Sequence, residues 1–257
     1  MNSYNASWSK THTTFLFLIV ISMVLISFKF GPDYREFTWF VIMLLFFLFT
    51  LIAGHGITGV WKGLFIDERN EISLSRLQMI LWTIIILSSY LTIALTNIAV
   101  GWQNPLAIAI PNELWIAMGI STTSMVGSPL LLSQKKQKKF ETIDLALMAN
   151  KLYDQGEDPN DFDAVGGILV RNNPQNAKWA NLFRGEELTN AAHLDLAKIQ
   201  MFFFTIVILI AYAASISSLL APDDIRIDAL PALDQSVVIL LSISHGGYLV
   251  NKTLPQK

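Results

Sequence analysis

Two stretches of the chain, LSRLQMILWTIIILSSY at 74–90 and LAKIQMFFFTIVILIAY at 196–212, align without a gap. Leucine and isoleucine matches arise by chance between apolar segments, but polar, sulfur-containing and aromatic matches at fixed spacing rarely do. The matches of this kind are Gln78, Met79, Thr83 and Tyr90 over Gln200, Met201, Thr205 and Tyr212. A weaker match follows, because Gly119-Ile120-Ser121 aligns with Ser242-Ile243-Ser244. The alignment predicts that a unit of two helices is duplicated.

Both copies lie in a chain that is unusually apolar. It has 257 residues, of which 53% are hydrophobic and 15% charged, with a mean hydropathy of +0.46 and no cysteine, whereas a soluble domain carries about 25% charged residues. Six intervals contain no charged residue, and they are 11–28, 37–61, 77–112, 114–134, 199–222 and 235–251. An apolar run of about 18 or more residues is long enough to cross the hydrocarbon core as a helix. The composition excludes a soluble enzyme, a coiled coil, a disordered regulator and a disulfide-stabilised scaffold.

The charge-free intervals predict six membrane-spanning helices. Their approximate limits are Phe15–Phe28, Phe37–Ile57, Leu77–Ile98, Leu114–Leu132, Ile199–Leu220 and Gln235–Val250. We expect helices rather than strands, because each spanning backbone must satisfy its own hydrogen-bonding groups in lipid. The first is expected to be a retained span and not a signal peptide, because Lys29 and Pro32 follow it where a small-residue cleavage site would stand. The expected fold class is an all-α polytopic membrane protein.

The predicted spans divide the chain into four parts. Residues 1–75 form a hairpin of two spans and a loop, 76–133 form repeat A with spans three and four, 134–193 form an insert, and 194–257 form repeat B with spans five and six and a short tail. An even number of spans separates the two copies, so both enter the membrane from the same side. The repeats are therefore expected to be parallel rather than inverted.

The basic residues predict the orientation of the chain. One side holds the N-terminus, the 58–76 loop, the insert with residues up to 198, and the tail, with 15 lysines and arginines, while the other side holds three. Loops rich in lysine and arginine stay in the cytoplasm, so we expect both termini and the insert to be cytoplasmic, in a bacterial inner membrane. A basic run that directly follows the fourth span is expected to contact anionic lipid headgroups. It comprises Lys135, Lys136, Lys138 and Lys139. No aromatic residue is interleaved with these lysines, so nucleic acid is not an expected partner.

Each repeat begins with a residue suited to cap a helix. Ser73 and Asp195 occupy the same aligned position, three residues before Arg76 and Lys198. Serine and aspartate side chains accept hydrogen bonds from the first free backbone amides of a helix. We therefore expect a helix to begin beside each of them.

Polar residues within the repeated helices admit two interpretations. Gln78 and Gln200 lie near the cytoplasmic boundary, with Thr83 and Thr205 deeper in the membrane. In one interpretation they line a pore or vestibule. In the other they fix the packing of the helices, where a hydrogen bond between spans contributes about 1 kcal/mol.

The fourth and sixth spans also carry small or ionisable polar residues. They are Ser121, Thr122, Ser124 and Ser128 in the fourth span, and Ser244 and His245 in the sixth. Small residues let helices approach closely, whereas a row of hydroxyl groups lines a path for water or ions. An ionisable group inside a membrane is a functional candidate, and histidine titrates near neutral pH. The alternative is a neutral histidine that forms a hydrogen bond within the bundle.

The insert at 134–193 is the segment that we expect to bind or sense something soluble. An apolar helix face is predicted over 140–152, followed by a solvated acidic loop over 154–163 whose spacing does not fit an EF-hand. A short strand is predicted at Gly166–Val170, with Gly63–Ile66 as its partner. Trp179, Leu182 and Phe183 have helical spacing and predict a segment that lies on the membrane surface.

No set of residues typical of catalysis is visible, so we expect neither an enzyme, nor a metal site, nor a cofactor. The sequence Gly54–Gly59 matches G-x-G-x-x-G, but it ends a predicted span instead of joining a strand to a helix. Because the predicted spans contain no Asp, Glu, Lys or Arg, a proton-driven transporter is also disfavoured.

Three functions remain open. The first is a homo-oligomeric ion channel or pore, in which spans three to six line the path and the insert acts as a gate or sensor. The second is a non-conducting membrane scaffold or sensor whose insert docks a cytoplasmic partner, for instance in stress response or phage defence. The third, and weakest, is a transporter of a small neutral solute.

Overall fold

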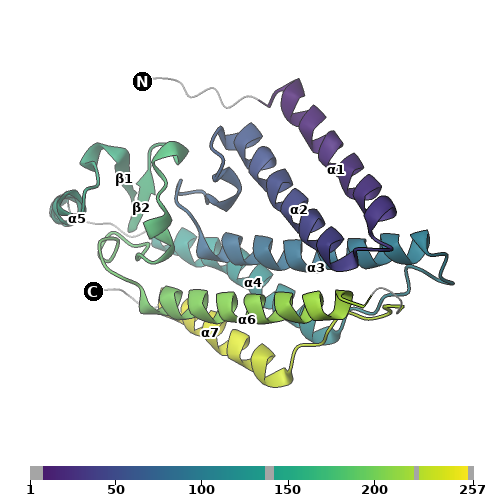
Figure 1. Ribbon diagram of the computed structural model, residues 1–257. Coiled ribbons are helices and arrows are strands. Elements are labelled where there is room, and N and C mark those ends of the chain that lie inside the picture. The colour runs from purple at the N-terminus through teal and green to yellow at the C-terminus, as the bar shows by residue number, and fades with distance from the viewer. Residues whose placement is uncertain (1–7, 137–141, 223–225, 254–257) are drawn as a thin grey trace. The chain divides into compact units, whose positions relative to one another are not determined.

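The computed structural model describes residues 8–136, 142–222 and 226–253, and the chain is mostly helical (Figure 1). The helices are α1 (Lys10–Phe30), α2 (Arg35–Thr58), α3 (Leu74–Ala99), α4 (Asn112–Lys135), α5 (Thr142–Asp154), α6 (Leu196–Leu220) and α7 (Gln235–Thr253). Short 3-10 helices are η1 (Gly63–Phe65), η2 (Pro159–Asp161), η3 (Pro174–Asn176) and η4 (Trp179–Leu182). The strands are β1 (Phe162–Val165) and β2 (Ile168–Arg171).

Five of these helices, α1, α2, α3, α4 and α6, are long and apolar enough to cross a membrane. This indicates a mostly helical, multi-pass integral membrane protein, as the composition predicts. Helix α7 covers the predicted sixth span and has 19 residues, but it is not among the five. The count of six spans therefore stays a prediction, and the β1–β2 hairpin adds a small sheet to the expected all-α fold.

The chain forms two compact units. The first comprises Met1–Leu64, Met79–Met118 and Ile206–Val238, and the second comprises Phe65–Gln78, Gly119–Thr205 and Ile239–Lys257. Helices α3, α4, α6 and α7 contribute residues to both. Each unit is thus assembled from segments far apart in the sequence.

In the first unit, α1 and α2 pack as a hairpin through Ile19, Met23, Ile42 and Ile52. Near the start of α2, the indole Nε1 of Trp39 donates a hydrogen bond of 3.1 Å to Ser88 Oγ of α3, and both side chains are buried. Helix α2 ends where Gly59 adopts a left-handed conformation with φ of 67°, which glycine adopts without strain. The glycine-rich segment at 54–59 therefore ends a helix, as predicted.

In the second unit, both predicted helix caps are present. Ser73 Oγ accepts a hydrogen bond of 3.5 Å from the backbone amide of Arg76, just before α3. Asp195 Oδ1 accepts from the amides of Ala197 at 3.0 Å and Lys198 at 3.2 Å, just before α6. The prediction of helix starts at these two residues is confirmed.

The insert has an apolar core of its own, and its strand pairing differs from the prediction. The core comprises Met148, Leu152, Phe162, Leu169, Leu188, Ala191 and Ala192. The predicted strand exists as β2, but it pairs with β1 in an antiparallel hairpin and not with residues 63–66. The reason is that Gly63–Phe65 forms η1 and Ile66 pairs with Ile72 instead.

The turn of this hairpin requires glycine at position 166. Gly166 has φ of 59°, and a Cβ atom there would lie 2.1 Å from the backbone oxygen of Lys136. Its neighbour Gly167 donates a backbone hydrogen bond of 3.0 Å to the carbonyl of Lys135. The hairpin therefore sits directly against the end of α4, at a distance that only glycine permits.

Candidate functional site

The loops that precede α3 and α6 close in the same way. The amide of Ser73 donates to the carbonyl of Phe65, and the amide of Asp195 donates to the carbonyl of Phe183, each over 2.8 Å. Immediately inside these bonds, single antiparallel bridges join Ile66 to Ile72 and Arg184 to Leu194. Each loop is thus closed at its base just before its helix begins.

The aligned basic residues of the two helices contact equivalent positions in these loops. Arg76 Nη1 donates to the carbonyl of Ile66 over 2.8 Å, and Lys198 Nζ donates to the carbonyl of Arg184 over 2.7 Å. The residue contacted follows the loop phenylalanine in both cases. The sequence similarity also extends upstream, since W-x-x-L-F occurs at 61–65 and again at 179–183. An ungapped alignment misses this, because the second loop is four residues longer.

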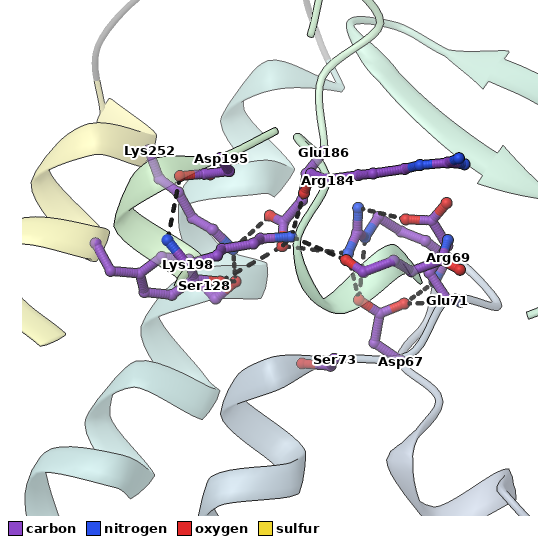
Figure 2. Close-up of polar contacts among 12 residues, drawn as sticks. Asp67, Arg69, Glu71, Ser73, Ser128, Arg184, Glu186, Asp195, Lys198 and Lys252 are labelled. Atoms are coloured by element: carbon purple, nitrogen blue, oxygen red, sulfur yellow. Dashed lines mark hydrogen bonds and ion pairs between the residues drawn. The ribbon is translucent and has the colours of Figure 1, made fainter. Parts of the chain in front are cut away.

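A cluster of buried charges lies at these helix ends, and Glu186 is its centre (Figure 2). The carboxylate of Glu186 pairs with Lys198 Nζ of α6 at 2.9 Å, with Arg69 Nη2 of the loop before α3 at 3.3 Å, and with Lys252 of α7. The side chains of all four residues are no more than 8% exposed. We call Arg69, Glu186, Lys198 and Lys252 the Glu186 cluster.

The cluster continues into a larger ion-pair network. Arg69 also pairs with Asp67 at 2.8 Å and Glu71 at 3.0 Å. Arg171, in β2, pairs with Glu71 at 3.6 Å and with Glu157 at 3.2 Å. Glu157 further accepts Arg184 at 2.6 Å and Lys178 at 2.8 Å, and Lys135 pairs with Glu187. Among the described residues, these ion pairs join seven basic side chains to five acidic ones, so the network carries surplus positive charge.

The cations control the ionisation of the carboxylates. Burial disfavours the charged form of Glu186, but Arg69, Lys198 and Lys252 outweigh it and hold the pKa of Glu186 well below its usual range. The pKa of Glu157 is likewise lowered, because its bonds to Lys178, Arg171 and Arg184 outweigh its burial. Glu71 differs, since burial together with the nearby Asp67 raises its pKa despite the pull of Arg69. Glu186 therefore stays ionised at neutral pH and holds three cations from three segments.

Of the predicted candidates in the repeated helices, the structure pairs Gln78 with Thr205. Gln78 Nε2 donates to Thr205 Oγ1 at 2.7 Å and to the carbonyl of Met201 at 3.2 Å, and both side chains are buried. Their repeat counterparts behave differently, because Gln200 is exposed and Thr83 donates to the carbonyl of Met79 within its own helix at 2.8 Å. The aligned residues therefore do not form equivalent contacts.

Among the candidates in the fourth and sixth spans, one pair meets, and a further candidate contacts a lysine at the end of α7. Ser124 Oγ lies 2.7 Å from His245 Nδ1, and Ser128 contacts Lys252. Thr122 is exposed on α4. Other polar atoms are buried without a hydrogen-bond partner among the residues that the structure describes. They include Ser121 Oγ, Ser244 Oγ, Gln78 Oε1 and His245 Nε2.

The predicted headgroup lysines have different surroundings. Lys135 is buried and paired with Glu187, which replaces its interpretation as a lipid anchor, because its ammonium group is used inside the protein. Lys136 is exposed and remains compatible with that role. Lys138 and Lys139 lie outside the described residues.

Sequence reasoning missed the Glu186 cluster and misjudged Glu157. The acidic run at 154–163 was expected to be solvated, but Glu157 is 3% exposed and binds three cations. The prediction failed because its partners lie 14 to 27 residues further along the chain. The repeated W-x-x-L-F segment is the signal that directs attention to the loops holding Arg69 and Glu186.

An open cleft lies beside this network in the second unit. It has a volume of about 960 Å³ and is lined by α5, the loop before α6, and the adjoining parts of α6 and α7. Its walls include Lys151, His193, Gln200, Ser244 and Gly247. Of the predicted candidates, the cleft thus brings together Gln200 and Ser244.

Comparison with protein-family models, curated proteins and solved structures finds no match for this chain. Within residues 8–136, 142–222 and 226–253, no group of three or more His, Cys, Asp or Glu side chains is arranged to hold a metal ion.

Proposed function

We propose that the chain is a non-conducting membrane sensor or scaffold, whose insert at 134–193 docks a partner in the cytoplasm and is coupled to the membrane helices. The observation that carries this proposal is the position of Glu186. This residue belongs to the insert, yet it binds cations from the loop before α3, from α6 and from α7. Breaking a buried ion pair by removing one partner typically costs about 3–5 kcal/mol. A partner that moves the insert would therefore change the ion pairs of Glu186 with the loop before α3, with α6 and with α7.

The polar contacts inside the spans favour a packed bundle. Gln78 donates to Thr205, and Ser124 lies within hydrogen-bond distance of His245. Bonds between neighbouring helices stabilise the bundle and occupy Gln78 Nε2, Thr205, Ser124 and His245 Nδ1 within the protein.

The proposed membrane topology has six spans with both termini in the cytoplasm, and spans three to six arise from a duplicated pair. The duplication is supported by the matching closure of the loops before α3 and α6 and by the equivalent contacts of Arg76 and Lys198. A duplicated pair of parallel hairpins is compatible with assembly into a homo-oligomer. We place the protein in a bacterial inner membrane and assign it no catalytic step.

The test uses the full-length protein reconstituted in liposomes. We expect no ion flux across several salts and pH values. In Glu186→Gln, hydrogen exchange should rise in the insert, in the loop before α3 that holds Arg69, and at the ends of α6 and α7 that carry Lys198 and Lys252. The matched control is Glu68→Gln in the loop before α3, because Glu68 is exposed. Sustained ion flux, or faster exchange confined to the insert, would overturn the proposal.

A channel is the second candidate, and one observation favours it. Ser121 and Ser244 align in the two repeats, and both hydroxyl groups are buried without a partner among the described residues. Unsatisfied polar groups at membrane depth are costly, and water in a pore would satisfy them. In this case liposomes should show ion flux, and the double variant Ser121→Ala with Ser244→Ala should reduce it.

A further inference from the structure

The walls of the cleft combine polar and apolar side chains. Lys151 of α5 and His193 of the loop before α6 provide exposed polar groups. Exposed apolar side chains lie beside them, namely Leu194 (69% exposed), Leu196 (76%) and Ile243 (63%). A cavity that offers both polar groups and exposed apolar side chains suits an amphipathic ligand.

One buried hydroxyl group in the cleft lacks a partner. The side chain of Ser244 lines the cleft, its residue is 5% exposed, and its Oγ has no hydrogen-bond partner among the described residues. Buried polar atoms in proteins are nearly always paired. A ligand oxygen in the cleft would provide the missing acceptor.

A glycine in the same wall has no explanation in the packing of the protein. Gly247 lies inside α7 and lines the cleft, and a Cβ atom added there would meet no atom within 4 Å. Its neighbour Gly246 also has open space there, so what distinguishes Gly247 is that it lines the cleft. Glycine does allow a ligand to lie directly against the backbone of the helix.

The charges around the cleft favour an anion. Lys151 and His193 face it, and the acidic residue in its wall, Asp195, accepts hydrogen bonds from the amides of Ala197 and Lys198 at the start of α6. The neighbouring ion-pair network adds surplus positive charge, since it contains two more basic than acidic side chains among the described residues.

We propose that this cleft binds a phospholipid with an anionic headgroup. The phosphate contacts Lys151 and His193, an oxygen of the headgroup region accepts a hydrogen bond from Ser244, and an acyl chain lies along α6 and α7 against Leu196, Ile243 and Gly247. This site does not depend on the sensor role, because it requires only the cleft and a membrane.

The experiment compares two adjacent glycines in the full-length protein. Gly246 and Gly247 both have open space where a Cβ atom would stand, but only Gly247 lines the cleft. The variants are Gly246→Leu and Gly247→Leu. Each is extracted from vesicles that contain equal amounts of phosphatidylglycerol and phosphatidylcholine, and native mass spectrometry counts the lipids that it retains. We expect wild type and Gly246→Leu to retain one phosphatidylglycerol per chain. In Gly247→Leu, the fraction of chains that retain this lipid should fall at least tenfold.

A second variant keeps the proposal falsifiable if leucine at 247 disturbs folding. Lys151→Gln changes an exposed side chain and should reduce the preference for phosphatidylglycerol over phosphatidylcholine at least fivefold. Glycerol phosphate and inorganic phosphate are added as competitors at millimolar concentration. Equal retention of both lipids by wild type, equal retention by both glycine variants, or displacement of the lipid by either soluble phosphate would overturn a lipid site.

Discussion

The side-chain amide of Gln78 donates a hydrogen bond of 2.7 Å to the hydroxyl group of Thr205, which lies 127 residues later in the chain. The two residues belong to different members of the aligned helix pair, and both are buried. Their aligned counterparts are Gln200, which is exposed, and Thr83, which is half-buried. Two helices with nearly the same polar residues therefore use them on differently buried faces.

The first prediction follows from this difference. Gln78→Leu removes the donor to Thr205 and should lower the stability of the helix bundle by about 1 kcal/mol, the typical contribution of a hydrogen bond between spans. Gln200→Leu should leave the stability unchanged, because Gln200 has an exposed side chain. Thermal unfolding of the two variants in the same detergent measures both effects. Equal losses would contradict the assigned role of Gln78 in packing.

A second prediction concerns Glu157 in the insert. Glu157→Gln leaves Arg171 buried with a weakened set of partners, which should destabilise the insert by about 3–5 kcal/mol. Asp163→Asn is the matched control, because Asp163 is an exposed acidic residue of the same run. Hydrogen exchange along β2 should rise in Glu157→Gln alone. Unchanged exchange there would show that the ion pairs of Glu157 contribute little to the stability of the insert.

A third prediction is that acid loosens the ion-pair network. The pKa values of Glu186 and Glu157 are lowered in the folded protein, so their ion pairs contribute fully above about pH 4.3, the usual pKa of glutamate, and this contribution is lost as the pH falls toward the folded values. The raised pKa of Glu71 has the opposite effect on stability, because a protonated Glu71 favours the folded state. We expect the two groups with lowered pKa values, Glu186 and Glu157, to outweigh it. The protection of the insert's amides, measured as the exchange rate relative to the intrinsic rate at each pH, should therefore fall between pH 5 and pH 3.

The double variant Glu157→Gln with Glu186→Gln provides the control for this titration. The protection of its insert amides should already be low at pH 7 and should change less between pH 5 and pH 3. If wild type and the double variant respond to acid in parallel, other groups are responsible.

A fourth prediction concerns the cap of α6. Asp195→Ala removes the acceptor for two backbone amides and should destabilise the start of α6 by about 1 kcal/mol. Ser73→Ala should have a smaller effect on α3, because Ser73 accepts one longer bond of 3.5 Å. Exchange of the amides of Ala197 and Lys198 measures the first effect. Slower exchange in Asp195→Ala than in wild type would exclude the capping role.

The helices and their caps could be predicted from the sequence because the signals are local. Long apolar runs predict α1, α2, α3, α4 and α6, and Ser73 and Asp195 identify two helix starts. The helices extend beyond the charge-free runs, for example α1 begins at Lys10, since charged side chains at helix ends reach the polar boundary.

The Glu186 cluster could not be predicted in this way. Arg69, Glu186 and Lys252 look like ordinary solvated charges in the sequence, and only the tertiary fold buries them together. The same holds for the partner of β2, because a strand of four residues carries too little pattern to select one neighbour over another. Lys135 was misjudged for a similar reason, since its partner Glu187 lies 52 residues away.

The four additional residues in the loop before α6 give the two loops of the proposed duplication different contacts. Both loops are closed by the same bonds at the base, so extra length is accommodated at the tip without shifting the helix that follows. The longer loop contributes His193, next to its closed base, and part of the wall of the open cleft, while the shorter loop places Asp67 and Glu71 beside Arg69. The longer loop therefore combines two roles, because it holds Glu186 at the centre of the buried ion pairs and also forms part of the cleft wall.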